Sequence, residues 1–380
     1  MLTIKRRITL EEAYRLCHAD EIVVAEDVFP PNHQGEGAPL LKEGATLTVN
    51  FLNRLQQRDV ESVLIDYPLT ALSKPSEQIR EETLQLVNVE VNNFVRANYL
   101  HPALPAIEED MYAALTESKT ALVAVHLMTE YKPAFFRKSI RSALVSALLA
   151  HELIRKGKAV SAVSARQIAL AALVQNVGYI YVADSCALEE ERSLRGYSRP
   201  DFLAHPEKGS EILQLLGGDA AFCAIVHHHE EASDASGIGG LSLEEIPLES
   251  LFIRAGDDFR RLLDCGFSHH EALTKMADES MRYVVRAANG EEIALPDHLP
   301  DLIVRYPVGT VVVLNDGTHG RVSKVFEGDL ERPMIDIIGK KEVPIFHEDS
   351  ATLKGITYVT HLDLRRSATS TIVKELKGCT

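Results

Sequence analysis

The most constraining feature of this sequence is a long central stretch, residues 134 to about 290, in which apolar residues recur at the spacing of α-helices. A helix with one apolar stripe must bury that stripe against a neighbour, so several such helices in succession pack around a shared core. We therefore expect a helical bundle over residues 134–295. Two of its stripes are Ile140, Leu144, Leu148 and Leu149, and Ile168, Leu170, Leu173 and Val174.

The pattern changes after Pro300. Two β-branched runs, 310–314 and 321–325, flank Asn315-Asp316-Gly317. An Asp-Gly pair supplies the positive backbone dihedrals that a tight hairpin needs. Further strand-like runs follow near 334–338 and 357–360, so the sequence predicts a small β-rich C-terminal domain over residues 300–380.

The chain before the bundle predicts two smaller parts. Residues 1–72 contain a strand-like run at 21–25, helical spacing over 47–58 and a second strand at 60–65, which indicates a small α+β domain. Residues 73–133 predict a helical linker that could be a spacer or the surface of a homodimer. A single hydrophobic core stops growing near ~250–300 residues, so a chain of 380 residues is expected to be multidomain, and here predominantly α.

Charge and cysteine content exclude several classes of function. The formal net charge is -15, whereas general affinity for nucleic acid backbones or anionic membranes is driven by positive charge. We expect neither kind of partner, although a local basic pocket stays open. Five scattered cysteines without a CxxC pair indicate neither a disulfide framework nor a zinc ribbon. Because no signal-peptide pattern and no apolar run near the ~20 residues of a membrane span is found, we expect a cytoplasmic protein.

The strongest local signal is a set of short motifs inside the expected bundle. Neighbouring imidazoles and carboxylates bind divalent transition metals, which can activate water for attack on phosphorus. The motifs are His205-Pro206-Glu207-Lys208-Gly209, His227-His228-His229-Glu230, Asp234 with Gly237, Glu245-Ile246-Pro247-Leu248-Glu249, and Asp257.

In their order and intervals, residues 138–290 resemble the HD-GYP family, metal-dependent phosphodiesterases that hydrolyse the bacterial second messenger cyclic di-GMP. The family pattern runs His-Pro-x-x-Gly, then His-His-Glu-x-x-Asp-Gly-x-Gly-Tyr-Pro, Ile-Pro-Leu-Glu and an Ala-Asp pair. The N-terminal part and residues 306–310 are also similar to appendages of family members. The resemblance implies an HD-type helical bundle, with metal-ligand positions at His205, His228, His229 and Asp257 and a further candidate at Asp234.

The chain departs from the family pattern at several functional positions. Gln175-Asn176 stands where the family has its His-Asp pair, so the resemblance implies that a bridging carboxylate is missing. Lys138 stands at an early histidine, and an ammonium offers no lone pair to a metal. Tyr179 replaces a lysine expected to meet the substrate phosphate. Gly237-Ile238-Gly239 replaces the Gly-Tyr-Pro signature, after a loop with one extra residue.

Two interpretations of the remaining ligand positions stay open. They could hold one divalent transition metal, iron or manganese, at low occupancy, or none, with the histidines satisfied by local hydrogen bonds. Asp257, beside Asp258, could be a solvated charge, and Asp234 a turn carboxylate. The Lys138 charge could also occupy the site in place of a metal.

The leading hypothesis is a catalytically inactive HD-GYP-like signalling protein, in which no catalytic residue is assigned. It would act as a scaffold for a signalling protein partner or as a cyclic di-GMP sensor. The alternative is a weak metal-dependent cyclic di-GMP phosphodiesterase.

Overall fold

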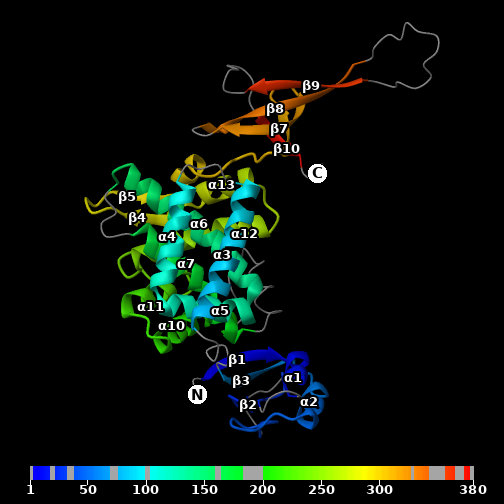
Figure 1. The fold of residues 1–380 in the computed structure, drawn as a ribbon, viewed down its shortest axis with the longest axis vertical. Helices are drawn as coiled ribbons and strands as arrows, with labels where there is room; N and C mark the ends of the chain where they lie inside the picture. Colours follow the sequence, from blue (N-terminus) through cyan, green and yellow to red (C-terminus); the bar gives the residue numbers. More distant parts are fainter. Residues whose placement is uncertain are drawn as a thin grey trace, which may run out of the picture.

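The computed structural model describes residues 3–17, 22–31, 38–68, 76–98, 103–158, 164–182, 200–326, 329–341, 356–363 and 372–376. Figure 1 shows three bodies along the longest axis, with the N-terminal sheet at the bottom, helices in the middle and a second sheet at the top. Helices predominate in the described chain, as expected. No helix in these ranges is both long and apolar enough to cross a membrane.

The N-terminal body is a three-stranded antiparallel sheet, of order β1-β3-β2, with two helices. Its own hydrophobic core includes Ile8, Leu52 and Ile65, each almost completely buried. Each helix begins at a threonine whose side chain accepts a backbone N–H, which is the usual way to satisfy a free helix terminus. The elements are β1 (Thr3–Thr9), α1 (Leu10–Leu16), β2 (Val23–Val24), α2 (Val49–Gln56) and β3 (Ser62–Pro68).

The middle body is helical and carries the motifs singled out in the sequence. Its first helices are α3 (Ser76–Asn98), α4 (Leu104–Glu117), α5 (Lys119–Tyr131), α6 (Pro133–Arg155) and α7 (Ala165–Val174). The 3-10 helix η2 (Gln175–Tyr181) continues directly from α7. Then follow α9 (Pro200–Leu203), α10 (His205–Leu215), α11 (Ala220–His227), α12 (Leu248–Asp264), α13 (His269–Asp278), η3 (Ser280–Tyr283), the hairpin β4 (Val284–Arg286) and β5 (Glu292–Ala294), and η4 (Leu295–Asp301).

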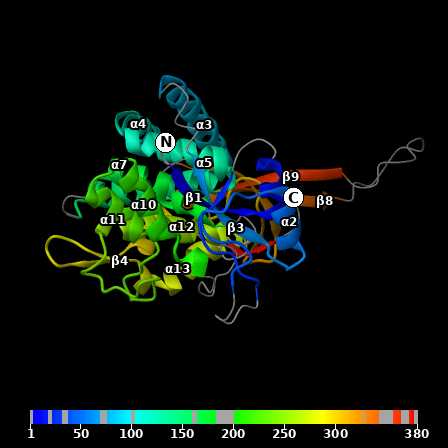
Figure 2. The same ribbon diagram turned by 90° about the horizontal axis from the view of Figure 1, so that it is seen from below.

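The helices expected as a linker share the core of the bundle. Met111 of α4, Leu127 of α5 and Leu148 of α6 belong to one continuous hydrophobic cluster. In Figure 2, which looks from below, β1 and β3 lie in front of this helical body. β1 packs against η2, so the N-terminal sheet contacts the segment that carries Gln175 and Asn176.

The C-terminal body is a five-stranded antiparallel sheet of order β10-β6-β7-β8-β9. The predicted hairpin joins β6 to β7, and Gly317 in its turn has a φ of +82° that favours glycine. A separate core includes Val312, Val322 and Ile335. The strands are β6 (Val311–Leu314), β7 (His319–Phe326), β8 (Asp329–Lys341), β9 (Ile356–Asp363) and β10 (Ile372–Leu376).

Candidate metal centre and buried ion network

Two buried histidines face each other at the centre of the helical body. His205 is the first residue of α10, and His229 follows the C-terminal end of α11. Their Nε2 atoms are 3.1 Å apart. Each Nδ1 lies beside a backbone carbonyl oxygen, that of Phe202 at 2.6 Å for His205 and that of Val226 at 2.7 Å for His229.

The hydrogen bonds of this pair fix where the protons lie. A carbonyl oxygen only accepts, so each Nδ1 must carry the hydrogen and donate it. Burial and the neighbouring imidazole hold the pKa of His205 well below its usual value, and burial lowers the pKa of His229 to about 4. Both rings are therefore neutral at pH 7, and two Nε2 lone pairs point at each other. A cation between them would remove this repulsion.

Glu230 completes a group of three ligands. Its Oε1 lies 3.9 Å from both histidine Nε2 atoms, and the three ligand atoms lie within 4.8 Å of one another. Two imidazoles and a carboxylate suit a divalent transition metal, so the donor set fits one ion of that class. Glu230 also accepts hydrogen bonds from Arg254, at Oε2, and from Arg261, at Oε1 over 2.5 Å. A bound ion would compete with these two guanidinium groups.

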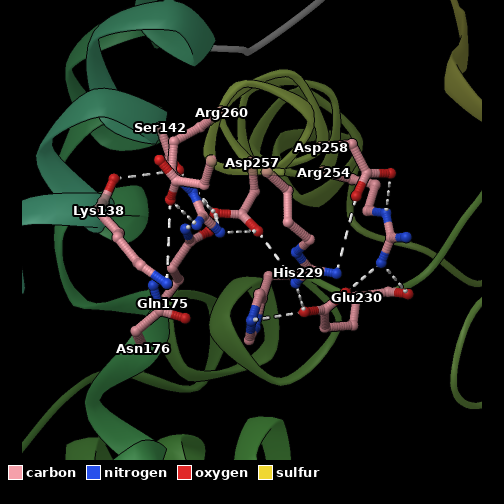
Figure 3. Close-up of polar contacts among 12 residues, drawn as sticks. Lys138, Ser142, Gln175, Asn176, His229, Glu230, Arg254, Asp257, Asp258 and Arg260 are labelled. Carbon is pink, nitrogen blue, oxygen red and sulfur yellow. Dashed lines mark hydrogen bonds and ion pairs between the residues drawn. The ribbon is translucent and has the colours of Figure 1, made fainter. Parts of the chain in front are cut away.

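Asp257 is engaged by protein donors (Figure 3). The side chains of Ser142 and Gln175 donate to its Oδ1 over 2.7 and 3.0 Å. Arg260 Nη2 lies 2.9 Å from both carboxylate oxygens, and Arg261 Nη2 lies 3.1 Å from Oδ2. Burial has the largest single effect on the pKa of Asp257 and would raise it, but the Arg260 charge and the hydrogen bonds from Ser142 and Arg260 together lower it. Asp257 is thus an ionised carboxylate surrounded by donors.

These contacts belong to one buried ion network. Asp258 accepts from Arg254 Nε over 2.8 Å and from the Tyr283 hydroxyl over 2.9 Å. The network pairs three carboxylates with three guanidinium groups, so its formal charges cancel. Apart from Glu230, its members all come from α12, at the i,i+3 and i,i+4 spacings that put side chains on one helix face. They are Glu230, Asp257, Asp258, Arg254, Arg260 and Arg261.

The positions that depart from the family pattern surround this network. Asn176 donates to Ser139 of α6 over 2.9 Å. Gln175 Oε1 is buried and accepts no hydrogen bond from the described part of the chain. The Tyr179 ring stacks on His205 with centroids 4.3 Å apart. Lys138 Nζ lies 3.9 Å from an Asp264 oxygen and over the ring of Phe135, at 5.1 Å from its centroid.

Two other predicted ligand positions lie outside the group of three. His228 caps α11 and is half-buried, and its ring contacts that of His227. Asp234 is exposed and accepts hydrogen bonds from the backbone and hydroxyl of Ser236, as a turn carboxylate does. Their role as metal ligands, like that of Asp257, stays a prediction.

Sequence reasoning did not single out Glu230 or the three arginines as site residues. Glu230 directly follows the histidine run, and its position beside two metal-binding residue types was the available signal. For the arginines, the available signal was their spacing of three or four residues from Asp257 and Asp258 on one helix.

Comparisons with known proteins give little beyond this geometry. No protein-family description matches the chain, and no curated protein does. Among solved structures, Bd1817, a HDG"Y"P protein from Bdellovibrio bacteriovorus, is similar with 15% sequence identity and a TM-score of 0.35. The match covers 70% of this chain and 90% of that chain.

Proposed function

We propose that this chain is a catalytically inactive, HD-GYP-like signalling protein, which acts as a scaffold or as a cyclic di-GMP sensor. The proposal rests on the contacts of the Asp257 carboxylate, whose oxygens are occupied by hydrogen bonds and ion pairs within the chain. The donors are Arg260, Arg261, Ser142 and Gln175. By resemblance, this carboxylate stands at a metal-ligand position. Here its negative charge is balanced by guanidinium groups of the chain.

Guanidinium groups cannot replace the chemistry of metal ions. A bound divalent metal lowers the pKa of water and so supplies hydroxide near pH 7. Arginine stays protonated, has no acceptor and cannot bind hydroxide as a Lewis acid. The side chains of Gln175 and Asn176 bring no charge either, and they are held by Asp257 and Ser139. The buried network is therefore suited to stabilising a fold and unsuited to activating water.

A second candidate function is weak metal-dependent cleavage of cyclic di-GMP. It is favoured by the facing Nε2 lone pairs of His205 and His229, which together with Glu230 could hold one iron or manganese ion. Such an ion would supply a Lewis acid. To bind this ion, Glu230 would have to give up at least part of its ion pairs with Arg254 and Arg261.

The experiment that separates these functions is product analysis with cyclic di-GMP in the presence of manganese or ferrous iron. We expect no appreciable product and at most one tightly bound metal ion per chain by elemental analysis. Steady product formation that is lost in His229→Ala, and kept in the matched control His227→Ala, would overturn the proposal. Two or three bound ions per chain would contradict the ligand assignment.

One measurement distinguishes a sensor from a scaffold. Equilibrium binding of cyclic di-GMP to the intact chain, without product, would favour a sensor. Absence of binding would favour a scaffold that recognises a protein partner.

A further inference from the structure

The chain passes from the helical body to the C-terminal sheet within a few residues. Leu302 and Ile303 belong to the core of the helical body, whereas Val304 and Tyr306 belong to the core of the sheet. α13 lies at the end of the helical body that faces this sheet (Figure 1). It packs against η4, and η4 packs against β8. The contacts of residues 304–306 therefore influence how the sheet sits on the helices.

Two adjacent histidines at the start of α13 contact this junction. They are the first two residues of the helix, directly after the capping residue Ser268. His269 is buried, and its Nδ1 donates to the Val304 carbonyl oxygen over 2.8 Å. The ring of His270 lies against that of Tyr306, with centroids 5.3 Å apart. The helix thus contacts the chain at the point where it enters the sheet.

The contact between His270 and Arg305 requires a neutral histidine. Arg305 Nη1 lies 3.0 Å from His270 Nδ1. A guanidinium group only donates, so Nδ1 must offer its lone pair, and the hydrogen of the ring lies on Nε2. The second acceptor of Arg305 is Glu331 of β8, whose Oε1 lies 3.1 Å from Nη2. Arg305 thus joins α13 to the sheet as long as His270 carries no proton on Nδ1.

The surroundings of His270 resist its protonation. Burial and the Arg305 charge lower the pKa of His270 from 6.5, and together they outweigh Glu375 and Glu271, which raise it. The N-terminus of α13 also carries a positive partial charge, which disfavours a cation there. The titratable groups around the ring are Arg305 and Tyr306 of the connection, Glu331 of β8, Glu375 of β10, and His269 and Glu271 of α13.

The direction of this effect gives its pH dependence. A histidine released from these surroundings binds a proton more tightly than the docked one. The docked arrangement is therefore fully favoured above pH 6.5 and is weakened as the pH falls.

We propose that His270 and Arg305 form an acid-sensitive contact, in which protonation of His270 breaks the hydrogen bond with Arg305 and loosens the C-terminal sheet from the helical body. A protonated ring would place a second positive charge at the nitrogen that now lies 3.0 Å from the guanidinium group, so attraction would turn into repulsion. The proposal goes beyond the proposed function, because neither residue belongs to the motifs or to the buried ion network. It assigns a conformational switch to the junction between two bodies.

The test combines small-angle X-ray scattering with NMR of isotope-labelled histidines, on the full chain at pH 7.5 and 5.5. We expect the radius of gyration to increase at pH 5.5 and to return to its first value at pH 7.5. The NMR signal of His270, identified by its loss in His270→Gln, should report a hydrogen on Nε2 and none on Nδ1 at pH 7.5. In Arg305→Gln its pKa should rise toward 6.5, because the neighbouring cation is gone.

Two substitutions separate this contact from general effects of acid. His270→Gln keeps an acceptor for Arg305 and takes up no proton, so its radius of gyration should be the same at both pH values. His270→Arg carries its charge permanently and should be expanded already at pH 7.5, where the other buried histidines stay neutral. The matched control, His319→Gln, changes an exposed histidine of β7 and should respond to pH as the parent does. Circular dichroism checks that each protein is folded at the pH of measurement.

Three outcomes would overturn the proposal. The folded parent could keep its radius of gyration at pH 5.5, His270→Gln could expand as much as the parent, or folded His270→Arg could be as compact as the parent at pH 7.5. A hydrogen on His270 Nδ1 at pH 7.5 would likewise contradict the contact with Arg305 on which the proposal rests.

Discussion

Arg260 is the single residue on which the charge of Asp257 most depends. Its side chain is 1% exposed, and it donates to both Asp257 oxygens and to Asp264. Replacement by methionine, Arg260→Met, keeps the volume but leaves a buried carboxylate with fewer donors. We expect the free energy of unfolding to fall by about 3 kcal/mol, because the buried carboxylate loses its main compensating charge and keeps only the Arg261 guanidinium. Urea denaturation followed by circular dichroism measures it.

The control removes both charges together. In Arg260→Met combined with Asp257→Leu, no carboxylate is left uncompensated at this position, so stability should recover to within about 1–2 kcal/mol of the parent. A double variant that is less stable than the single one would mean that packing, and not charge, governs the site.

The buried histidines make the stability of the chain depend on pH. The pKa of His229 is lowered by burial from 6.5 to about 4 in the folded state, so the unfolded state takes up a proton first. Stability from this group is complete above pH 6.5 and is lost as the pH falls toward 4. We expect a decrease of about 3 kcal/mol over this interval from His229, and a further one from His205, whose pKa is lowered too.

Chelator-treated protein, denatured with urea at pH 7, 5.5 and 4.5, measures this dependence. His229→Gln should flatten the profile, whereas His227→Gln, a change of the exposed neighbouring histidine, should not. A parent profile that is already flat between pH 6.5 and 4.5 would contradict the neutral, facing pair.

The residues of the site differ in how far sequence could predict them. His205, His229, Gln175 and Asn176 were singled out from the sequence because each stands at a defined position of a motif, and their roles stay predictions. The partners of Asp257 were not found, because a motif does not say which neighbour will neutralise a buried charge. Arg260 and Arg261 could equally have been exposed to solvent, and only the packing of α12 against α6 turns them inward.

At the scale of elements, the packing of η2 against α10 holds the histidine pair in place. Gly178 lies so close to α10 that an added Cβ would overlap the His205 carbonyl group and lie 2.7 Å from Gly209 N. Both are backbone atoms, which cannot rotate away. We expect Gly178→Ala to lower the free energy of unfolding by at least about 2 kcal/mol, as overpacking does.

Gly209→Ala is a milder substitution at the same contact between η2 and α10. Its Cβ would meet Gly178 N at 3.3 Å and two valine methyl groups at 3.5 Å, so small shifts accommodate it. The loss of stability in thermal melts should be clearly smaller than for Gly178→Ala. Equal losses would show that the helices do not approach as closely as described.

Elements with a strong period were predicted from the sequence, and β1 is one of those that were missed. Residues close together in the sequence determine the apolar stripes of α6 and α7 and the Asp-Gly turn between β6 and β7. These elements can therefore be predicted from short segments of the sequence. β1 was missed because Lys5-Arg6-Arg7 has the composition of an exposed segment. Arg6 is nonetheless buried, stacked over the ring of Tyr131 and paired with Glu12, which are contacts that only the tertiary fold creates.

At the scale of the whole molecule, the described chain has three large separate hydrophobic clusters, one in each body. The contact between the N-terminal sheet and the helical body has polar members, among them Lys5, Asp66 and Lys208. Polar contacts between bodies couple their unfolding weakly. The sequence did not show that α3 to α5 belong to the helical body, because apolar spacing marks a helix face but not the partner of that face.

The arrangement of cores predicts which truncations share an unfolding transition. Met111 of α4 and Leu148 of α6 lie in one cluster, and Leu52 of α2 in another. Each truncation to alanine should cost about 2–5 kcal/mol in its own core. In differential scanning calorimetry we expect more than one transition, with Met111→Ala and Leu148→Ala lowering the same transition and Leu52→Ala lowering a different one. If Met111→Ala instead left the Leu148 transition in place, residues 73–133 would unfold as an independent linker, and the shared core would not be a cooperative unit.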